Sequence, residues 1–296
     1  MNDTAIPVSG ARTLARDLVG LTKPRIISLL LVTTIAPMFV AGRPGWELVL
    51  VVFIGGYLMA GGANAVNMYL DRDIDDRMSR TRLRPLPSGR MQPREALAFG
   101  LLLATTATFL LARYVNVLTA ALALAGFYAY VFLYTRWLKR STPQNIVIGG
   151  AAGAFPPLVG WAAVTGSVDL MAVYLFLIVF YWTPPHFWAL ALNKQRDYGR
   201  AGVPMAPLVW GDTETRRQML WYTIILSALT VVPWAMGALG DVYLVSALLL
   251  DALLVRGIVR VIRADDYTKP AWAVYKYSLL YLALLFGAMV LDRVTS

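Results

Sequence analysis

Nine apolar segments, each of roughly 20 residues, constrain the fold of this sequence more than any other feature. A helix of that length crosses the hydrocarbon core of a bilayer, and it satisfies all of its backbone hydrogen bonds internally, as lipid demands. The sequence therefore predicts an all-α polytopic membrane protein with nine transmembrane helices. The expected spans are Ile26–Ala41, Leu48–Val66, Ala96–Ala112, Val115–Tyr134, Ile146–Thr165, Leu170–Leu192, Leu220–Gly237, Val242–Val261 and Trp272–Leu291.

The composition supports this class and excludes others. Hydrophobic residues make up 58% of the chain and charged residues only 15%, whereas soluble domains carry about 25% charged residues. There is no cysteine, which excludes disulfides, a thiolate nucleophile and a thiolate metal site. A net charge of +10 could point to nucleic acid, but in a membrane protein basic loops are better explained by the positive-inside rule, so no nucleic-acid partner is expected.

The distribution of lysine and arginine predicts the topology. Basic residues crowd before the first span and after the second, fourth, sixth and eighth spans, while the opposite loops hold very few. We therefore expect a cytoplasmic N-terminus and an external C-terminus in a cytoplasmic (inner) membrane of bacterial type. Residues 1–25 lack the apolar core of a signal peptide and are interpreted as a cytoplasmic arm of a single domain spanning 1–296. Pro184 and Pro185 should kink or locally unwind the sixth span.

A cluster of oxygen-bearing side chains follows the second span. Asn67, Asp71 and Asp75 are spaced four residues apart, so on a helix they share one face. Such oxygens suit a hard cation such as Mg²⁺. The alternative is that these acids only solvate the helix end and pair with Arg72 or Arg77. Aspartate at a helix C-terminus opposes the helix dipole, which argues against stability as the sole reason for the placement.

A second cluster follows the sixth span. His186, Leu190, Asn193 and Asp197 form one helical stripe, and Asn193-x-x-x-Asp197 repeats the pattern of Asn67-x-x-x-Asp71. Asn193 and Asp197 can bind a second metal ion or the same ion from the opposite side. We therefore expect the chemistry in two cytoplasmic segments, at about 67–94 and 193–217.

Basic residues beside both clusters suit a phosphate-bearing ligand. Arginine grips phosphate oxygens in bidentate fashion, and Arg80 and Arg84 are the leading candidates after the first cluster. Lys194 and Arg200 can neutralise phosphate at the second cluster. The topology alone demands basic loops here, so most of these residues have an alternative explanation.

His186 is the only histidine in the chain. It could be a neutral imidazole hydrogen-bonded to backbone groups freed by the prolines, an axial ligand to haem iron, or a proton acceptor near a reacting carbon. The sequence leaves these alternatives open.

Four segments resemble one known family. NMYLDRDIDDRMSRTRLRPLPSG, from Asn67, looks like the first acidic motif of the UbiA-type intramembrane prenyltransferases. The segments LTKPR from Leu21, STPQNIVIGGAAGAFPPLVGWAA from Ser141 and TPPHFWALALNKQRDYGRAGVPMAPLV from Thr183 fit the same superfamily. Within it, the chain most closely resembles the protohaem IX farnesyltransferases, or haem O synthases. Asn193 and Met68 stand where many superfamily members carry acids, a departure that resembles this subfamily and leaves the metal content of the second motif open.

The resemblance implies a fold and an activity. The fold would be a bundle of nine helices around a central cavity open to lipid. The activity would be transfer of a farnesyl group from farnesyl diphosphate to a vinyl group of haem B, with water addition, giving haem O. Asn67, Asp71 and Asp75 would match the first Mg²⁺–diphosphate motif, Asn193 and Asp197 the second, and Arg25 in LTKPR would join the diphosphate-binding residues.

The same resemblance implies substrates, partners and alternatives. Haem B would be a substrate rather than a permanent cofactor, and a downstream haem A synthase or oxidase assembly factor would be a candidate partner. Two other functions stay open: a UbiA-type transferase acting on a hydroxybenzoate or quinone precursor, and a transporter or haem chaperone. The position of the acids at the membrane edge rather than at its midplane argues against a transporter.

Overall fold

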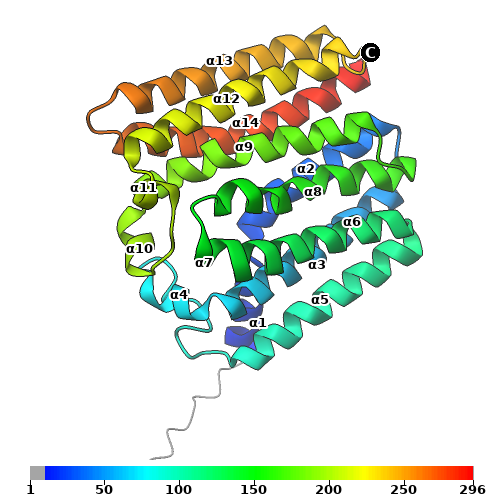
Figure 1. The fold of residues 1–296 in the computed structure, drawn as a ribbon. Coiled ribbons are helices and arrows are strands. Elements are labelled where there is room, and N and C mark those ends of the chain that lie inside the picture. Colours follow the sequence, from blue (N-terminus) through cyan, green and yellow to red (C-terminus); the bar gives the residue numbers. More distant parts are fainter. Residues whose placement is uncertain (1–10, 296) are drawn as a thin grey trace, which may run out of the picture.

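The computed structural model describes residues 11–295, and this part of the chain is a bundle of helices (Figure 1). Within it, nine helical segments are long and apolar enough to cross a membrane, as the sequence predicts. They are α2 (Pro24–Ala41), α3 (Trp46–Leu70), α5 (Pro93–Tyr114), the continuous segment Val117–Ser141, α8 (Asn145–Thr165), α9 (Leu170–Asn193), α12 (Asp212–Ala235), α13 (Asp241–Arg263) and α14 (Thr268–Thr295).

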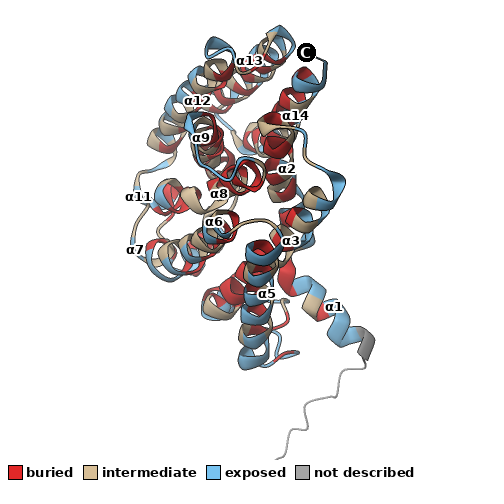
Figure 2. Cartoon of the chain, turned by 90° about the vertical axis from the view of Figure 1, so that its right-hand side faces the viewer, coloured by how far each residue is buried: buried red, intermediate tan, exposed pale blue. Residues whose placement is uncertain are grey.

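The outward faces of these helices are apolar. Leu102, Phe109 and Leu249 remain 64%, 67% and 63% exposed, respectively. Figure 2 shows this arrangement, with buried residues turned towards the interior and exposed ones on the outer faces of α5, α12 and α13. Contact of so much apolar surface with water would be unfavourable, whereas contact with lipid tails is not. The chain is therefore a multi-pass membrane protein.

Helices α8 and α9 lie at the centre of the bundle. Helix α8 packs against α2, α6 (Val117–Tyr128) and α9, and α9 packs in turn against α12 and α14. Helix α3 pairs with α5 on one flank, and α13 lies against both α12 and α14 on the other. The short helices α1 (Ala11–Thr22), α4 (Arg72–Arg77), α10 (Gln195–Arg200) and α11 (Ala206–Val209) gather at one end, away from the C-terminus (Figure 1). Both polar segments of the sequence are thereby brought to the same end.

The N-terminal arm is partly described. Residues 1–10 lie outside the described residues, and Ala11–Thr22 form α1. Leu14 and Val19 on α1 are exposed, whereas Asp17 is buried and accepts hydrogen bonds from Arg90 at 3.1 and 3.3 Å. This pairing attaches the arm to the loop that follows the first acidic cluster.

Two local expectations are corrected. Helix α9 runs without interruption through Pro184 and Pro185, so of the two expected effects, a kink or a local unwinding, the unwinding does not occur. Each proline removes one backbone donor, but the rest of the ladder continues and neighbouring helices support it, as when Trp182 donates to the backbone oxygen of Ser278 on α14. The fourth span also extends beyond the expected Tyr134. It continues as a π-helix, η1 (Ala129–Leu138), and then α7 (Lys139–Ser141), so Arg136, Lys139 and Arg140 lie on helix and not in a loop.

Close packing of α8 on α2 gives a stability prediction. A Cβ atom at Gly160 would lie 1.8 Å from the backbone oxygen of Thr34 on α2, whereas one at Gly153 on the same helix would meet nothing within 4 Å. We expect Gly160→Ala to destabilise the purified protein by about 3 kcal/mol, because two helix backbones must separate. Gly153→Ala should leave the thermal unfolding midpoint unchanged or slightly raised. Equal midpoints for both variants would contradict the packing described here.

Candidate active site

The first acidic cluster keeps its helical register beyond the end of α3. Asp71 is the capping residue that follows α3, yet its amide donates to Asn67 O at 2.9 Å and the amide of Asp75 on α4 donates to Asp71 O at 2.7 Å. Asn67, Asp71 and Asp75 are all at least 97% buried. The structure thus places the three side chains on one stripe, as the sequence predicts, and inside the protein where uncompensated charge is costly.

Three cations donate hydrogen bonds to this stripe. Lys139 Nζ lies 2.5 Å from Asp71 Oδ2, Arg84 Nη1 lies 2.7 Å from Asp75 Oδ2, and Lys23 Nζ donates to Asn67 Oδ1 at 2.8 Å. None of the three partners is Arg72 or Arg77, the neighbours that a purely structural role would favour. The cluster is therefore an array of alternating charges assembled from four segments of the chain.

Lys23 was not among the predicted site residues, and its backbone conformation is unusual. It lies between α1 and α2 with φ at 54°, and within the described residues it is the only non-glycine residue with positive φ. A non-glycine residue is strained in that region, and such strain clusters at functional sites. Burial lowers the pKa of its ammonium group to about 7, and the nearby Arg84 acts in the same direction. The sequence signals for Lys23 were its position directly before Pro24 and its place in the LTKPR segment, from which Arg25 was selected instead.

The π-helix η1 explains how Lys139 reaches Asp71. Thr135, on η1, accepts a hydrogen bond from Asn67 Nδ2 at 3.0 Å and donates to Tyr130 O at 2.8 Å. Tyr130 and Tyr134 stack with their centroids 5.7 Å apart. Gly149 on α8 makes room for that pair, because a Cβ there would lie 2.3 Å from Tyr134 Cδ2. Turns of this type are rare and occur often at functional sites.

Arg140 fixes the outer edge of the cluster. It donates to both carboxylate oxygens of Asp73 at 2.7 Å, and this interaction lowers the pKa of Asp73 to about 2. Arg140 also donates to Leu70 O at 2.8 Å and lies 3.8 Å from Asp71 Oδ1. Asp73 therefore holds α7, which follows η1, against α4 and is not part of the buried stripe.

The second cluster meets the first through Ser79. Its hydroxyl bridges to Asp197 on α10, 2.8 Å from Oδ1 and 3.1 Å from Oδ2. Ser79 and Asp197 are 118 residues apart in sequence. Asn193, at the end of α9, donates from Nδ2 to Ala189 O at 3.1 Å, while its Oδ1 is buried without a hydrogen-bond partner. The predicted meeting of the two acidic segments at one end of the bundle is thus observed.

The donor set fits a magnesium ion shared with a phosphate ligand. Among the described residues, no three histidine, cysteine or acidic side chains are close enough to hold a metal by themselves. Mg²⁺ is usually held by one or two carboxylates, with waters and substrate phosphates completing its shell. Two buried oxygens lack hydrogen bonds, Asp71 Oδ1 in the first cluster and Asn193 Oδ1 in the second. Such oxygens are what a hard cation or its waters can satisfy.

The other predicted phosphate ligands are placed less directly. Arg80 is exposed. Burial raises the pKa of Tyr198, the residue after Asp197, and the positive charge of Arg80 acts in the opposite direction. Lys194 lies over the ring of Trp272, with Nζ 5.5 Å from its centroid. Arg25 and Arg200 are exposed. For these four residues, phosphate binding stays a prediction.

His186 is held by side chains and not by freed backbone groups. Its Nδ1 lies 2.7 Å from Ser278 Oγ, and the ring stacks between Trp182 and Tyr275 at centroid distances of 4.3 and 5.0 Å. Ser278 donates its one hydroxyl proton to Tyr275 O at 2.9 Å. With that proton on Tyr275 O, the serine would accept from Nδ1–H and Nε2 would be unprotonated. Such a nitrogen can accept a proton or ligate iron.

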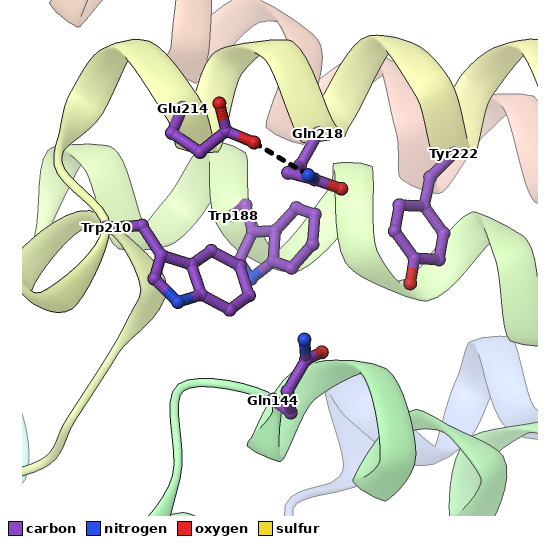
Figure 3. Close-up of a pocket in the computed structure, with 6 residues that line it drawn as sticks. All are labelled: Gln144, Trp188, Trp210, Glu214, Gln218 and Tyr222. Atoms are coloured by element: carbon purple, nitrogen blue, oxygen red, sulfur yellow. Dashed lines mark hydrogen bonds between the residues drawn. The ribbon is translucent and has the colours of Figure 1, made fainter.

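A separate pocket lies beside the second segment. This cavity of about 330 Å³ is lined by Gln144, Trp188, Trp210, Glu214, Gln218 and Tyr222 (Figure 3). Gln218 donates to Glu214 at 2.7 Å, and Trp188 makes edge contacts with the rings of Trp210 and Tyr222. None of the acidic residues above lines it, so it is not the metal and phosphate site.

The chain as a whole matches a known family. The profile of the UbiA prenyltransferase family matches residues 29–285. The chain belongs to this family. Both acidic segments fall inside the matched range, so the array of Asn67, Asp71, Asp75 and Asp197 is part of the family's own domain.

Relatives within the UbiA family are close in sequence. The chain is 57% identical to a protoheme IX farnesyltransferase of Roseiflexus castenholzii, over 99% of this chain and 55% of that protein. It is 52% identical to a protoheme IX farnesyltransferase of Symbiobacterium thermophilum, over 94% of both. The chain thus spans about half the length of the first relative and nearly all of the second.

Solved structures agree with the UbiA fold. A digeranylgeranylglyceryl phosphate synthase matches with a TM-score of 0.78 at 18% identity, covering 95% of this chain and 99% of that one. A UbiA homolog from Archaeoglobus fulgidus bound to DMAPP and Mg²⁺ matches with a TM-score of 0.65 at 15% identity, covering 92% and 99%. At these identities the likeness establishes the fold alone, and it confirms the UbiA-type bundle predicted from the sequence.

Proposed function

We propose that this UbiA-family chain is a protohaem IX farnesyltransferase. It transfers the farnesyl group of farnesyl diphosphate to a vinyl group of haem B, and water adds in the same transformation to give haem O. The observation that carries the proposal is the buried stripe of Asn67, Asp71 and Asp75 with its cations, which is joined through Ser79 in the following loop to Asp197 on the second segment. Relatives with this activity at up to 57% identity support the choice of substrates.

The diphosphate would be bound where the two acidic segments meet. Asn67, Asp71, Asp75 and Asp197 would hold Mg²⁺, with Asn193 Oδ1 as a further oxygen on the second segment. A bound Mg²⁺ supplies positive charge that stabilises the departing diphosphate. The homolog from Archaeoglobus fulgidus bound to GPP and Mg²⁺ supports this arrangement, since its fold is the same.

The chain's own cations have a defined part in this reaction. Lys23, Lys139 and Arg84 lie against the stripe. When diphosphate binds, they can turn from amide and carboxylate to phosphate oxygens, and their positive charge stabilises the growing negative charge as the C–O bond breaks. Arg25, Arg80, Lys194 and Arg200 form a second set that would bind the outer phosphate oxygens.

The interior beside the stripe would direct the allylic cation. The bonding pair of the C–O bond leaves with diphosphate, and the electron pair of the vinyl group forms the new C–C bond. Tyr130 and Tyr134 stack next to Asp71 and present ring faces that stabilise a cation. An apolar surrounding limits premature capture by water. The cation left beside the porphyrin is then quenched by water, which releases a proton.

His186 would face the haem. Its Nε2 carries no proton when Nδ1–H donates to Ser278, so it could ligate the haem iron or accept the proton that water releases. The stacked rings of Trp182 and Tyr275 hold it in one orientation. If His186 ligates the iron, haem binding to the parent protein should change the haem absorbance, and His186→Ala should abolish that change. A spectrum that is the same in both proteins would favour the proton-accepting role.

The setting of this reaction follows from the topology. We place residues 1–296 in one integral-membrane domain of a bacterial cytoplasmic membrane, with the N-terminus cytoplasmic and the C-terminus external. Farnesyl diphosphate would present its head at the cytoplasmic edge while its tail and haem B share the lipid-open interior. A haem A synthase or an oxidase assembly factor would receive the product.

The test uses purified protein in detergent with haem B, farnesyl diphosphate and Mg²⁺. The pigment is followed by mass and retention. The expected product is haem plus a farnesyl group and one water. It should form only with Mg²⁺ and at a rate proportional to the enzyme concentration. Prenylation of a phenolic acceptor without any haem product would replace the haem assignment by the quinone-precursor alternative. Haem binding with no transfer to any acceptor would favour a haem chaperone.

A further inference from the structure

An unassigned groove lies at the basic end of α13. A cavity of about 830 Å³ is lined by Arg256, Arg260 and Arg263 together with Ala252, Val255 and Pro270 at the start of α14. It shares no residue with the acidic array or with the pocket of Figure 3. Its lining combines three guanidinium groups with an apolar wall.

The exposed residues of α13 form one stripe whose chemistry changes along the helix. Val245, Leu249 and Leu253 are 57%, 63% and 51% exposed, and Arg256, Arg260 and Arg263 continue the same stripe at steps of three and four residues. The apolar part faces outward where lipid tails lie, and the basic part follows towards the end that carries the acidic array (Figure 1). A phospholipid has the same order of tail and head.

The three arginines have no partners among the described side chains. None of them forms an ion pair there, and all three are exposed. They are also not needed to cap α13, because Arg216 on α12 donates to the backbone oxygens of Val261, Ile262 and Ala264 at 3.2 to 3.4 Å. Arg256 lies seven residues before Arg263, about 10 Å further into the membrane. A guanidinium at that depth either extends along its own side chain to the interface or is stabilised by an accompanying anion.

We infer that this groove binds one anionic phospholipid, with its phosphate between the three arginines and an acyl chain along Leu253 and Leu249. Charge complementarity selects the occupant, because basic pockets between spanning helices on the cytoplasmic side suit anionic head groups. The positive-inside rule explains why arginines occur on this side but not why three of them share one groove without ion pairs. The inference is independent of the proposed transferase activity.

The test measures lipid binding to the delipidated protein by native mass spectrometry. Dioleoylphosphatidylglycerol should form a persistent one-to-one adduct, and dioleoylphosphatidylcholine should not. The triple variant R256Q/R260Q/R263Q should bind phosphatidylglycerol about a hundredfold more weakly, since each surface cation contributes about a factor of five. The matched control R82Q/R94Q/R136Q removes the same charge from exposed arginines outside the groove and should bind as the parent does.

The outcomes separate the explanations. Equal weakening in both triple variants would reduce the effect to net charge and overturn the inference, as would equal binding of the two lipids. Competition by millimolar inorganic phosphate that abolishes the adduct would indicate a site for a free anion rather than for a lipid. If the triple variant fails to fold, R260Q alone should still weaken binding about fivefold, with R82Q as its control.

Discussion

Asp71→Asn is expected to lower kcat/KM for farnesyl transfer by at least about a thousandfold while the protein remains folded. Asp71 receives Lys139 at 2.5 Å and Asn67 at 2.8 Å on one oxygen, and its other oxygen is buried without a hydrogen bond. Asparagine keeps the shape and one acceptor but removes the charge that would hold a metal and diphosphate. A thousandfold loss corresponds to about 4 kcal/mol of transition-state stabilisation. Initial rates with haem B and farnesyl diphosphate measure it.

Asp76→Asn is the matched control for this variant. Asp76 follows Asp75 directly and belongs to the same short helix, but it is exposed and forms no ion pair among the described residues. Its replacement should change kcat/KM by less than about threefold and leave the thermal midpoint in place. Similar losses for both variants would mean that the loop needs negative charge in general and that Asp71 has no special part.

Asp197→Asn is expected to lower kcat/KM by about a hundredfold, a smaller loss because a single hydroxyl, that of Ser79, contacts Asp197. If the two acidic segments act on the same diphosphate, the double variant with Asp71→Asn should lose much less than the product of the two single losses. Kinetics of the two single variants and the double variant decide this. Fully multiplicative losses would separate the second segment from the first.

Ser79→Ala distinguishes the charge of Asp197 from its orientation. It removes the hydroxyl that bridges the two segments at 2.8 and 3.1 Å but keeps the carboxylate. We expect a loss of only about tenfold, mainly in KM, because the carboxylate can still reach the ligand without being held in place. A loss as large as that of Asp197→Asn would show that the bridge itself, and not the charge, is what the reaction needs.

The sequence predicted the parts of the molecule that depend on long periodic patterns. Nine apolar segments specify nine spans, and a spacing of four residues specifies that Asn67, Asp71 and Asp75 share a stripe even though α3 ends at Leu70. The repeat of the Asn-x-x-x-Asp pattern at Asn193 and Asp197 placed a second polar segment on the cytoplasmic side and left open whether it acts on the same metal ion. These patterns carry the information because membrane spans and helical stripes are local consequences of composition and spacing.

The residues that sequence reasoning missed depend on unusual backbone geometry. Lys139 reaches Asp71 because η1 is a π-helix, for which the residues around Tyr130 give no local signal. Lys23 reaches Asn67 from a strained left-handed conformation, whereas the sequence analysis favoured Arg25 two residues later. The local unwinding offered as one effect of Pro184 and Pro185 does not occur, since packing against α14 overrides a local preference. Tertiary contacts decided each of these cases.

The central claim is that the two acidic segments form one metal-dependent diphosphate site. Its most direct test is the binding of a non-reacting thiolodiphosphate analogue of farnesyl diphosphate to the purified protein, measured by calorimetry with Mg²⁺ and with a chelator. We predict one binding event that requires Mg²⁺ and is weakened at least about tenfold by either Asp71→Asn or Asp197→Asn. Binding that is equally tight in the chelator, or unaffected by Asp197→Asn, would contradict a single shared site.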